Sequence, residues 1–467
     1  MKKFTRILMC LLLCVFTFGL VACGRTTDNF VYPNSSSETF GNGGMAVQKG
    51  DYLYFVNGYL SADSQTEKNA SYTVGALMIA KLDSNGEIIR NEEGLISDDY
   101  YRVMSDRLAG FEASELYVYG EYLYFASPCQ EDEINDSGDM EWAKQRVDFY
   151  RIRLDRSGDV ERIYRSQVYN SNLDYAYYEV NNNVYLLVHE QGESLNDDSA
   201  EPKSDILTCV RVGGETIEIA TNVNSIVLKS DNSYNEIIYS TSVTESGETT
   251  TTLYKYDLSS NNSEQLINFD EDVDITEVTA GYIYITKEGR NEGELLRSSL
   301  DNINFTRVCY SGNKDNVFIS PDANVVVAFT GGTFEFYLYG DSKASPIIVT
   351  DSDAESITFV GFANGNMFYL DSPSNLKSIS YSNVLFSQTP QISTILTFSS
   401  DANTTYFDLD QDYLYFYQTV GSNSYLHRIR INNNLGETEE MIGVYLEDDI
   451  PEEEETDETD ETEESNA

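Results

Sequence analysis

The stretch GDYLYF at residues 50–55 returns as GEYLYF at residues 120–125 and as QDYLYF at residues 411–416. Aromatic and aliphatic residues directly after a Gly-acidic pair are typical of a β-strand that leaves a tight turn. Weaker copies begin at Val184, Ile237, Tyr282, Val325 and Met367. Eight blocks of this kind therefore span the chain, and the last five begin 42 to 46 residues apart.

Each block is followed by a second strand-like block that ends in a polar turn. Examples are LMIAKLDSNGE at residues 77–87 and FYRIRLDRSGD at residues 149–159. A unit of 42–46 residues that holds four short strands has the size of one β-propeller blade. The sequence therefore predicts an all-β fold, a single β-propeller over residues 43–446, with eight four-stranded blades favoured over seven.

The stretch SPDANVVV at residues 320–327, together with the recurring aromatic blocks, resembles the propeller repeats of bacterial exported lipoproteins. That family is related to the TolB-like and YWTD-like propellers, although true Tyr-Trp-Thr-Asp repeats are missing here. The resemblance covers nearly the whole body of the chain. It implies a propeller fold and is weak as an indication of function.

The N-terminus has the pattern of an export signal. Three basic residues lie within the first six, residues 7–20 are apolar, and Leu-Val-Ala-Cys follows at residues 20–23. This pattern resembles a bacterial lipoprotein signal peptide. The resemblance implies cleavage after residue 22, lipidation of Cys23, and a protein anchored by acyl chains to the cell membrane on its extracytoplasmic side. The alternative is an ordinary secretory signal with a coincidental cysteine.

Two polar segments flank the predicted propeller. Residues 23–42 contain the lipidated cysteine and a small, polar stretch that is expected to form a flexible tether. Residues 447–467 contain 13 acidic residues and no basic ones, so they cannot bury enough apolar surface to fold and are expected to be a disordered tail.

The charge of the chain limits its partners. It carries 78 acidic and 30 basic residues, a formal net charge of -48, and only 13 of the acids lie in the tail. A nucleic-acid binder needs a basic surface, so we expect no nucleic-acid partner. Anionic lipids would repel this chain unless a covalent anchor held it at the membrane. We expect a monomer with an acidic rim that selects a cationic or neutral partner.

Three connections predicted within the first three blades are long, at about residues 60–74, 127–147 and 189–205. In a propeller, such loops share one rim with the loops that join the blades, and loops gathered on one rim often form a binding surface. The alternative is that they are tolerated surface loops. The residues we expect on the ligand-binding face are Asp139, Glu141, Trp142, His189 and Glu190.

The sequence contains few residues suited to catalysis. His189 and His427 are its two histidines, and no Gly-x-Ser-x-Gly motif accompanies them. The three cysteines after Cys23 lie far apart, so we expect buried free thiols or at most one disulfide among Cys129, Cys209 and Cys309. The sequence therefore predicts no catalytic residue.

No zinc-type His/Cys cluster is present either. We expect no cofactor, with structural calcium as the open possibility at the acidic runs of residues 270–274 and 408–412, where carboxylates alternate with other residues. The favoured interpretation is a non-enzymatic, lipid-anchored propeller that binds or scaffolds a protein or envelope ligand. The alternative is a propeller hydrolase or lyase that acts on carbohydrate or lactone, with calcium as its possible cofactor.

Overall fold

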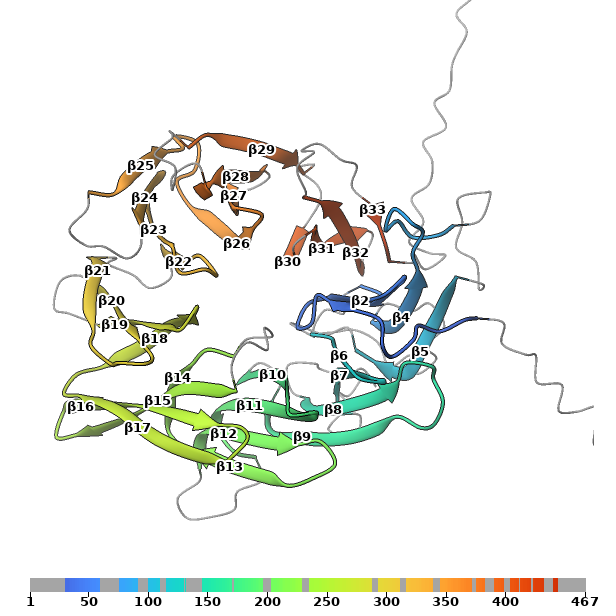
Figure 1. Cartoon of the computed structure of the whole chain (residues 1–467), viewed down its shortest axis with the longest axis horizontal. Helices are drawn as coiled ribbons and strands as arrows, with labels where there is room; N and C mark the ends of the chain where they lie inside the picture. The colour runs from blue at the N-terminus through green and yellow to red at the C-terminus, as the bar shows by residue number, and fades with distance from the viewer. Residues whose placement is uncertain are drawn as a thin grey trace, which may run out of the picture.

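A computed structural model describes most of the chain between residues 30 and 443. The described residues are 30–58, 75–90, 100–109, 115–129, 131, 145–169, 172–195, 203–228, 235–287, 293–310, 316–338, 345–371, 375–382, 390–398, 404–410, 412–420, 423–431 and 440–443. They form eight antiparallel sheets arranged as a ring (Figure 1). The predicted eight-bladed propeller is confirmed.

Within each blade the strands follow one another in chain order, from the centre of the ring outward (Figure 1). The first four blades are β1 (Thr39–Phe40), β2 (Ala46–Lys49), β3 (Tyr52–Val56), β4 (Ala76–Lys81) and β5 (Tyr101–Leu108); β6 (Tyr117–Tyr119), β7 (Tyr122–Pro128), β8 (Arg146–Arg153) and β9 (Glu161–Tyr169); β10 (Leu173–Val180), β11 (Asn183–Glu193), β12 (Ser204–Arg211) and β13 (Thr216–Ala220); β14 (Val223–Ile226), β15 (Glu236–Glu245), β16 (Glu248–Asp257) and β17 (Asn262–Phe269).

The other four blades have the same order. They are β18 (Val273–Thr279), β19 (Tyr282–Lys287), β20 (Glu294–Ser299) and β21 (Thr306–Tyr310); β22 (Val317–Ile319), β23 (Val325–Thr330), β24 (Thr333–Leu338) and β25 (Ile347–Thr350); β26 (Ile357–Ala363), β27 (Asn366–Asp371), β28 (Asn375–Ser380) and β29 (Ile392–Thr397); β30 (Thr404–Leu409), β31 (Tyr413–Val420), β32 (Asn423–Arg430) and β33 (Glu440–Met441). In seven blades the repeated aromatic block is the second strand and the block that follows it is the third. The first blade has five strands instead of the predicted four, because the short β1 pairs with the inner edge of β2, so β3 and β4 take the places of second and third strand there.

The second strands are the most buried because neighbouring blades cover both of their faces. In β3 every residue is buried, and the copy in β7 is buried at all but its first residue. Aromatic rings fill the space between blades, as where Tyr177 of β10 lies with its ring centroid 5.1 Å from that of Tyr117 and 5.0 Å from that of Tyr124. The high Tyr content of the chain is therefore used largely in blade-to-blade packing.

Buried charges also join blades. Lys377 of β28 donates hydrogen bonds to Asp351, which follows β25 in the preceding blade, at 2.8 Å, and lies 2.5 Å from a carboxylate oxygen of Asp371. Tyr369 donates a further hydrogen bond to Asp351 at 2.8 Å. Burial alone would raise the pKa of Asp351, but the hydrogen bonds from Lys377 and Tyr369 outweigh it and lower that pKa.

Side chains close the ring between the last blade and the first. Among the described residues, every strand of the last blade comes from the C-terminal part of the chain. The guanidinium of Arg428 donates to the carbonyl of Gly86 at 2.8 Å and to Glu440 at 2.8 Å, and its Cζ lies 4.3 Å from the ring centroid of Tyr413. This contact holds β31 and β32 against the β4–β5 connection of the first blade.

The segment before β1 packs on the propeller. Phe30 is 6% exposed, and its ring lies 5.9 Å from that of Tyr52 and 4.9 Å from that of Tyr32. The guanidinium of Arg102 lies 5.2 Å from the Phe30 ring. Part of the predicted flexible tether at residues 23–42 is therefore docked, because its aromatic residues find apolar surface on the first blade.

Candidate functional site

The connections between second and third strands lie on the same rim as the connections between blades, because the strands of each blade run alternately up and down. They are long in the first three blades, at residues 57–75, 129–145 and 194–203. In the other blades they are short, at residues 246–247, 288–293, 331–332, 372–374 and 421–422. The three blades with long connections are consecutive, as the sequence indicated, and most residues of these connections lie outside the described ones. The third is shorter than expected, because β11 continues to Glu193.

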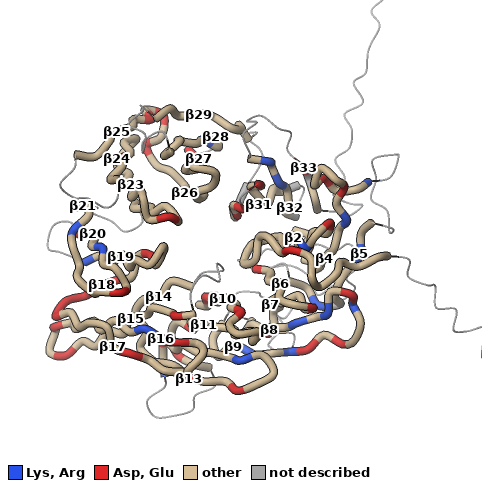
Figure 2. The backbone as a smooth tube through the Cα atoms, in the orientation of Figure 1, with Lys and Arg blue, Asp and Glu red and all other residues tan. Residues whose placement is uncertain are grey.

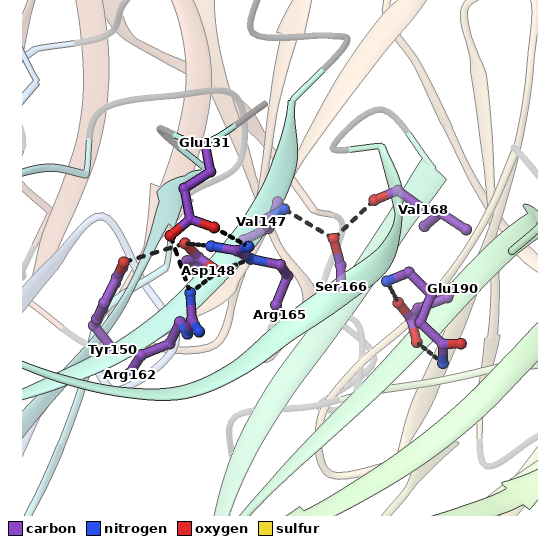
Figure 3. A network of polar contacts seen from close by, with 10 residues as sticks. Glu131, Val147, Asp148, Tyr150, Arg162, Arg165, Ser166, Val168 and Glu190 are labelled. Atoms are coloured by element: carbon purple, nitrogen blue, oxygen red, sulfur yellow. Dashed lines mark hydrogen bonds and ion pairs between the residues drawn. The ribbon is translucent and has the colours of Figure 1, made fainter. Parts of the chain in front are cut away.

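An arginine clamp holds the base of the second long connection (Figure 3). Arg165 of β9 donates two hydrogen bonds to Asp148 of β8, at 2.7 and 2.9 Å, and a third to Glu131 at 2.7 Å. Asp148 is 2% exposed and also accepts from Tyr150 at 3.2 Å, while Nη1 of Arg162 lies 3.8 Å from it. The fork of Arg165 thus ties the connection, through Glu131, to two strands of the blade.

The charges of the clamp support one another. The hydrogen bonds that Arg165 donates to Asp148 and Glu131 raise the pKa of Arg165, and the bond to Glu131 lowers the pKa of that carboxyl. A bidentate guanidinium–carboxylate pair is planar and directional, so it fixes geometry as well as charge. The network positions the connection and leaves little freedom at its base.

A β-bulge beside the arginine clamp makes a further contact between β8 and β9. The register of β8 and β9 shifts between Arg146 and Asp148, which leaves the amide of Val147 without a ladder partner. The hydroxyl of Ser166 accepts a hydrogen bond from that amide at 2.8 Å and donates to the carbonyl of Val168 at 2.7 Å (Figure 3). The amide of Val147 therefore has a hydrogen-bond partner despite the bulge.

Glu190 joins the second blade to the third. Its side chain is fully buried, and its carboxylate accepts hydrogen bonds from the amide of Gln167 and from the hydroxyl of Tyr164, the latter at 2.9 Å. Gln167 also accepts from the hydroxyl of Ser194 at 3.1 Å and from the amide of Leu195 at 2.7 Å. The start of the third long connection is therefore fixed to β9. Glu190 lies beneath the rim, not on its surface.

His189 is also buried, at 5% exposure, within β11. Its Nδ1 lies 4.0 Å from a carboxylate oxygen of Asp174. Burial lowers the pKa of His189 more than the charges of Asp174 and Asp205 raise it, so the neutral imidazole is favoured. The structure thus places both expected rim residues of the third blade inside the protein, because the strand runs past the point where the sequence suggested a loop.

The remaining expected site residues lie outside the described residues. These are Asp139, Glu141 and Trp142 of the second long connection, and Cys23. Among the described residues we find no helix with the length and apolar character that crossing a membrane requires. The predicted ligand contacts and the lipid anchor stay predictions.

A second group of acids lies on the inner strands. Burial raises the pKa of Glu115, two residues before β6, to about 8, although a hydrogen bond from Tyr117 opposes the rise. Burial raises the pKa of Asp408 in β30 to about 7, against a 2.9 Å hydrogen bond from the amide of Met45. The acidic run at residues 408–412 thus binds backbone amides of the protein.

Within the part of the chain that the structure describes, no group of three or more His, Cys, Asp and Glu side chains is arranged to hold a metal ion. Cys129, Cys209 and Cys309 are buried and form no disulfide with one another. His427 lies in β32 with its ring stacked on Phe416, 5.7 Å away between centroids.

Sequence reasoning did not single out Asp148 and Arg165. A signal was present, since Asp148 stands between apolar residues in a strand (Val147, Phe149) and the facing strand supplies two arginines. Acidic residues are otherwise distributed around the ring (Figure 2). In so acidic a chain, a single carboxylate indicates a buried ion pair only when its position within a strand is considered.

No family model matches the chain, and no curated protein matches it. It is similar to several solved structures. These include a prolyl endopeptidase, with 12% identity over 70% of this chain and 49% of the other and a TM-score of 0.45; the β-propeller domain of the Trilobed protease from Pyrococcus furiosus, with 9% identity over 72% and 97% and a TM-score of 0.43; and TolB from Acinetobacter baumannii, with 11% identity over 62% and 58% and a TM-score of 0.30. The chain thus spans about half the length of the prolyl endopeptidase, and similarity at this level carries no inference about activity.

Proposed function

We propose that this chain is a lipoprotein anchored through Cys23 on the extracytoplasmic side of a bacterial membrane, and that its propeller is a non-enzymatic binding or scaffolding module. It recognises a protein or envelope ligand through the rim that carries the connections 57–75, 129–145 and 194–203. The observation that carries the binding role is the clamp of Arg165 at the base of the second connection. A polar network centred on the buried Asp148 fixes the base of this connection, and a pre-organised surface loses less entropy on binding.

The burial of the chain's reactive side chains supports binding over the hydrolase or lyase alternative. Both histidines are 5% exposed and lie within strands. Burial raises the pKa of Cys209 and of Cys309 to about 12, which keeps both as neutral thiols. A general base or nucleophile must reach the substrate, and the burial of these side chains denies them that access.

Replacement of the second connection tests the binding role. Residues 132–140 are exchanged for a Gly/Ser segment of equal length, which keeps Glu131 in place for Arg165. The matched control makes the same exchange at residues 383–389, in the β28–β29 connection on the opposite rim. The intact chain and the control should capture the same envelope component, identified by mass spectrometry, and the 132–140 variant should lose it. Equal capture by all three proteins would refute the assignment to this rim.

The anchor has its own test. Cys23→Ser should move the protein from the membrane fraction to the soluble fraction, because acyl chains could then no longer be attached. Retention of the Cys23→Ser protein in membranes would refute lipid anchoring and leave the binding test unaffected.

A further inference from the structure

Phe30 docks on the rim opposite the long connections. Its ring packs against Tyr52, which directly follows the turn between β2 and β3, and lies under the guanidinium of Arg102 near the start of β5. Leu154 and Val160 of the β8–β9 connection belong to the same apolar cluster. Turns between first and second strands and between third and fourth strands share one rim. The chain thus enters the fold on the rim that does not carry the long connections.

The residues after Phe30 stay on this rim until they join the sheet. The carbonyl of Glu38 accepts a hydrogen bond from the amide of Gly50 at 3.0 Å, and Thr39 then pairs with Lys49 in the short ladder of β1 and β2. Gly50 has φ of 57°, and a Cβ there would lie 3.1 Å from the side chain of Ser37. The close approach of this segment to the turn therefore favours glycine.

The docked segment leaves a short leash. Seven Cα–Cα steps separate Cys23 from Phe30, and at about 3.6 Å per residue they span at most about 25 Å. If Phe30 were free, the leash would run to Thr39, with sixteen steps and a span of up to about 58 Å. Docking of Phe30 therefore more than halves the distance that the propeller can move from a lipid attached at Cys23.

We propose that Phe30 orients the propeller on the membrane, with the rim of the β2–β3 and β8–β9 turns toward the lipid and the long connections toward the aqueous phase. This orientation rests on the proposed lipid anchor. The lipid-facing rim exposes acidic residues, which repel anionic headgroups and hold the propeller off the bilayer. They are Asp51 and Asp159, whereas the exposed Glu121 and Asp155 on the same rim are paired with Arg153. The partner of the opposite rim is then a protein or envelope ligand on the aqueous side, not the anchoring bilayer.

Energy transfer to labelled lipids tests the orientation. Protein that begins at Cys23 is coupled through that thiol to maleimide lipids in vesicles with acceptor headgroups; Cys129, Cys209 and Cys309 are buried and do not compete. A donor dye is placed through an encoded azide at Asp159, on the lipid-facing rim, or at Leu195, on the far rim and 46% exposed. Strands of six to eight residues separate the rims by roughly 20–25 Å, so transfer from position 159 should exceed transfer from position 195 by about twofold.

Phe30→Ala should abolish this contrast, because the longer leash lets the propeller turn over. Val31→Ala is the matched control, since Val31 is 68% exposed, and it should keep the contrast. Circular dichroism verifies that both variants are folded. Equal transfer from the two positions in the unmodified chain, higher transfer from position 195, or full contrast in Phe30→Ala would each overturn the proposal. Chemical coupling makes this result independent of whether Cys23 is lipidated in cells, which the Cys23→Ser test decides.

Discussion

Replacement of Arg165 with Met should destabilise the protein strongly. The change removes the two hydrogen bonds to Asp148 and the one to Glu131 and keeps most of the side-chain volume. Asp148 is 2% exposed, and its remaining partners are Tyr150 and the more distant Arg162. Loss of one partner from a buried ion pair costs about 3–5 kcal/mol. Because Arg162 can approach Asp148, we expect the lower end, about 3 kcal/mol of unfolding free energy.

Urea unfolding followed by circular dichroism measures this loss. The double variant Asp148→Leu/Arg165→Met should recover most of the stability, since it leaves no buried charge unpaired. The matched control is Arg153→Met in the same blade, whose pairs with Glu121 and Asp155 are exposed, and it should leave the midpoint unchanged. A loss below about 1 kcal/mol in Arg165→Met, or a double variant less stable than the single one, would refute the clamp.

Three further predictions concern other buried groups. Lys377→Met should lower the free energy of unfolding by about 3–5 kcal/mol, with partial recovery when Asp351→Asn is added; thermal melts without such recovery would contradict the buried ion network. Burial lowers the pKa of His189 in the folded state, so the unfolded chain binds the extra proton below about pH 6.5. The free energy of unfolding should therefore decrease as the pH is lowered, more steeply than in His189→Gln. Parallel pH profiles of the two proteins would show that His189 is not the cause. In Gly44→Ala the new Cβ would clash with the carboxylate of Asp408, which accepts a hydrogen bond from the Met45 amide, so hydrogen exchange at that amide should accelerate. Gly247→Ala, a positive-φ site in another blade where no atom would contact the new Cβ, is the control and should leave this exchange unchanged. Equal exchange at Met45 in both variants would contradict a close approach of Gly44 to Asp408.

The repeated strands could be predicted because each blade solves the same packing problem. A second strand is covered on both faces, so its residues must be apolar or aromatic in every copy, as Leu53, Leu123 and Leu414 show with no exposed surface. The long connections could be predicted from the spacing of the repeats, because a repeat longer than 46 residues must place its additional residues between strands. Local sequence pattern and repeat spacing were therefore sufficient to predict the fold.

The candidate site could not be predicted in the same way, because its contacts are distant in sequence and specific to one place. Phe30 is one of few aromatic residues in a polar stretch, and only the surface beside Tyr52 distinguishes it from a residue of a linker. Glu190 ends an apolar run, so it resembled the start of a loop, whereas the backbone of Gln167 supplies its partner from another blade. Such placement depends on how two blades meet.

Some of the few basic residues of the chain are buried in ion pairs. Arg428, Lys377 and Arg165 have side chains that are 1%, 8% and 19% exposed, and each is paired with carboxylates inside the fold. The charges within these pairs cancel, so the remaining surface carries the full excess of acidic over basic residues in the chain. If the partner of the far rim is cationic, its affinity should fall as salt rises from about 0.05 to 0.5 M, because screening shortens the Debye length. Affinity that is independent of salt would instead indicate a neutral ligand, recognised through shape and hydrogen bonds.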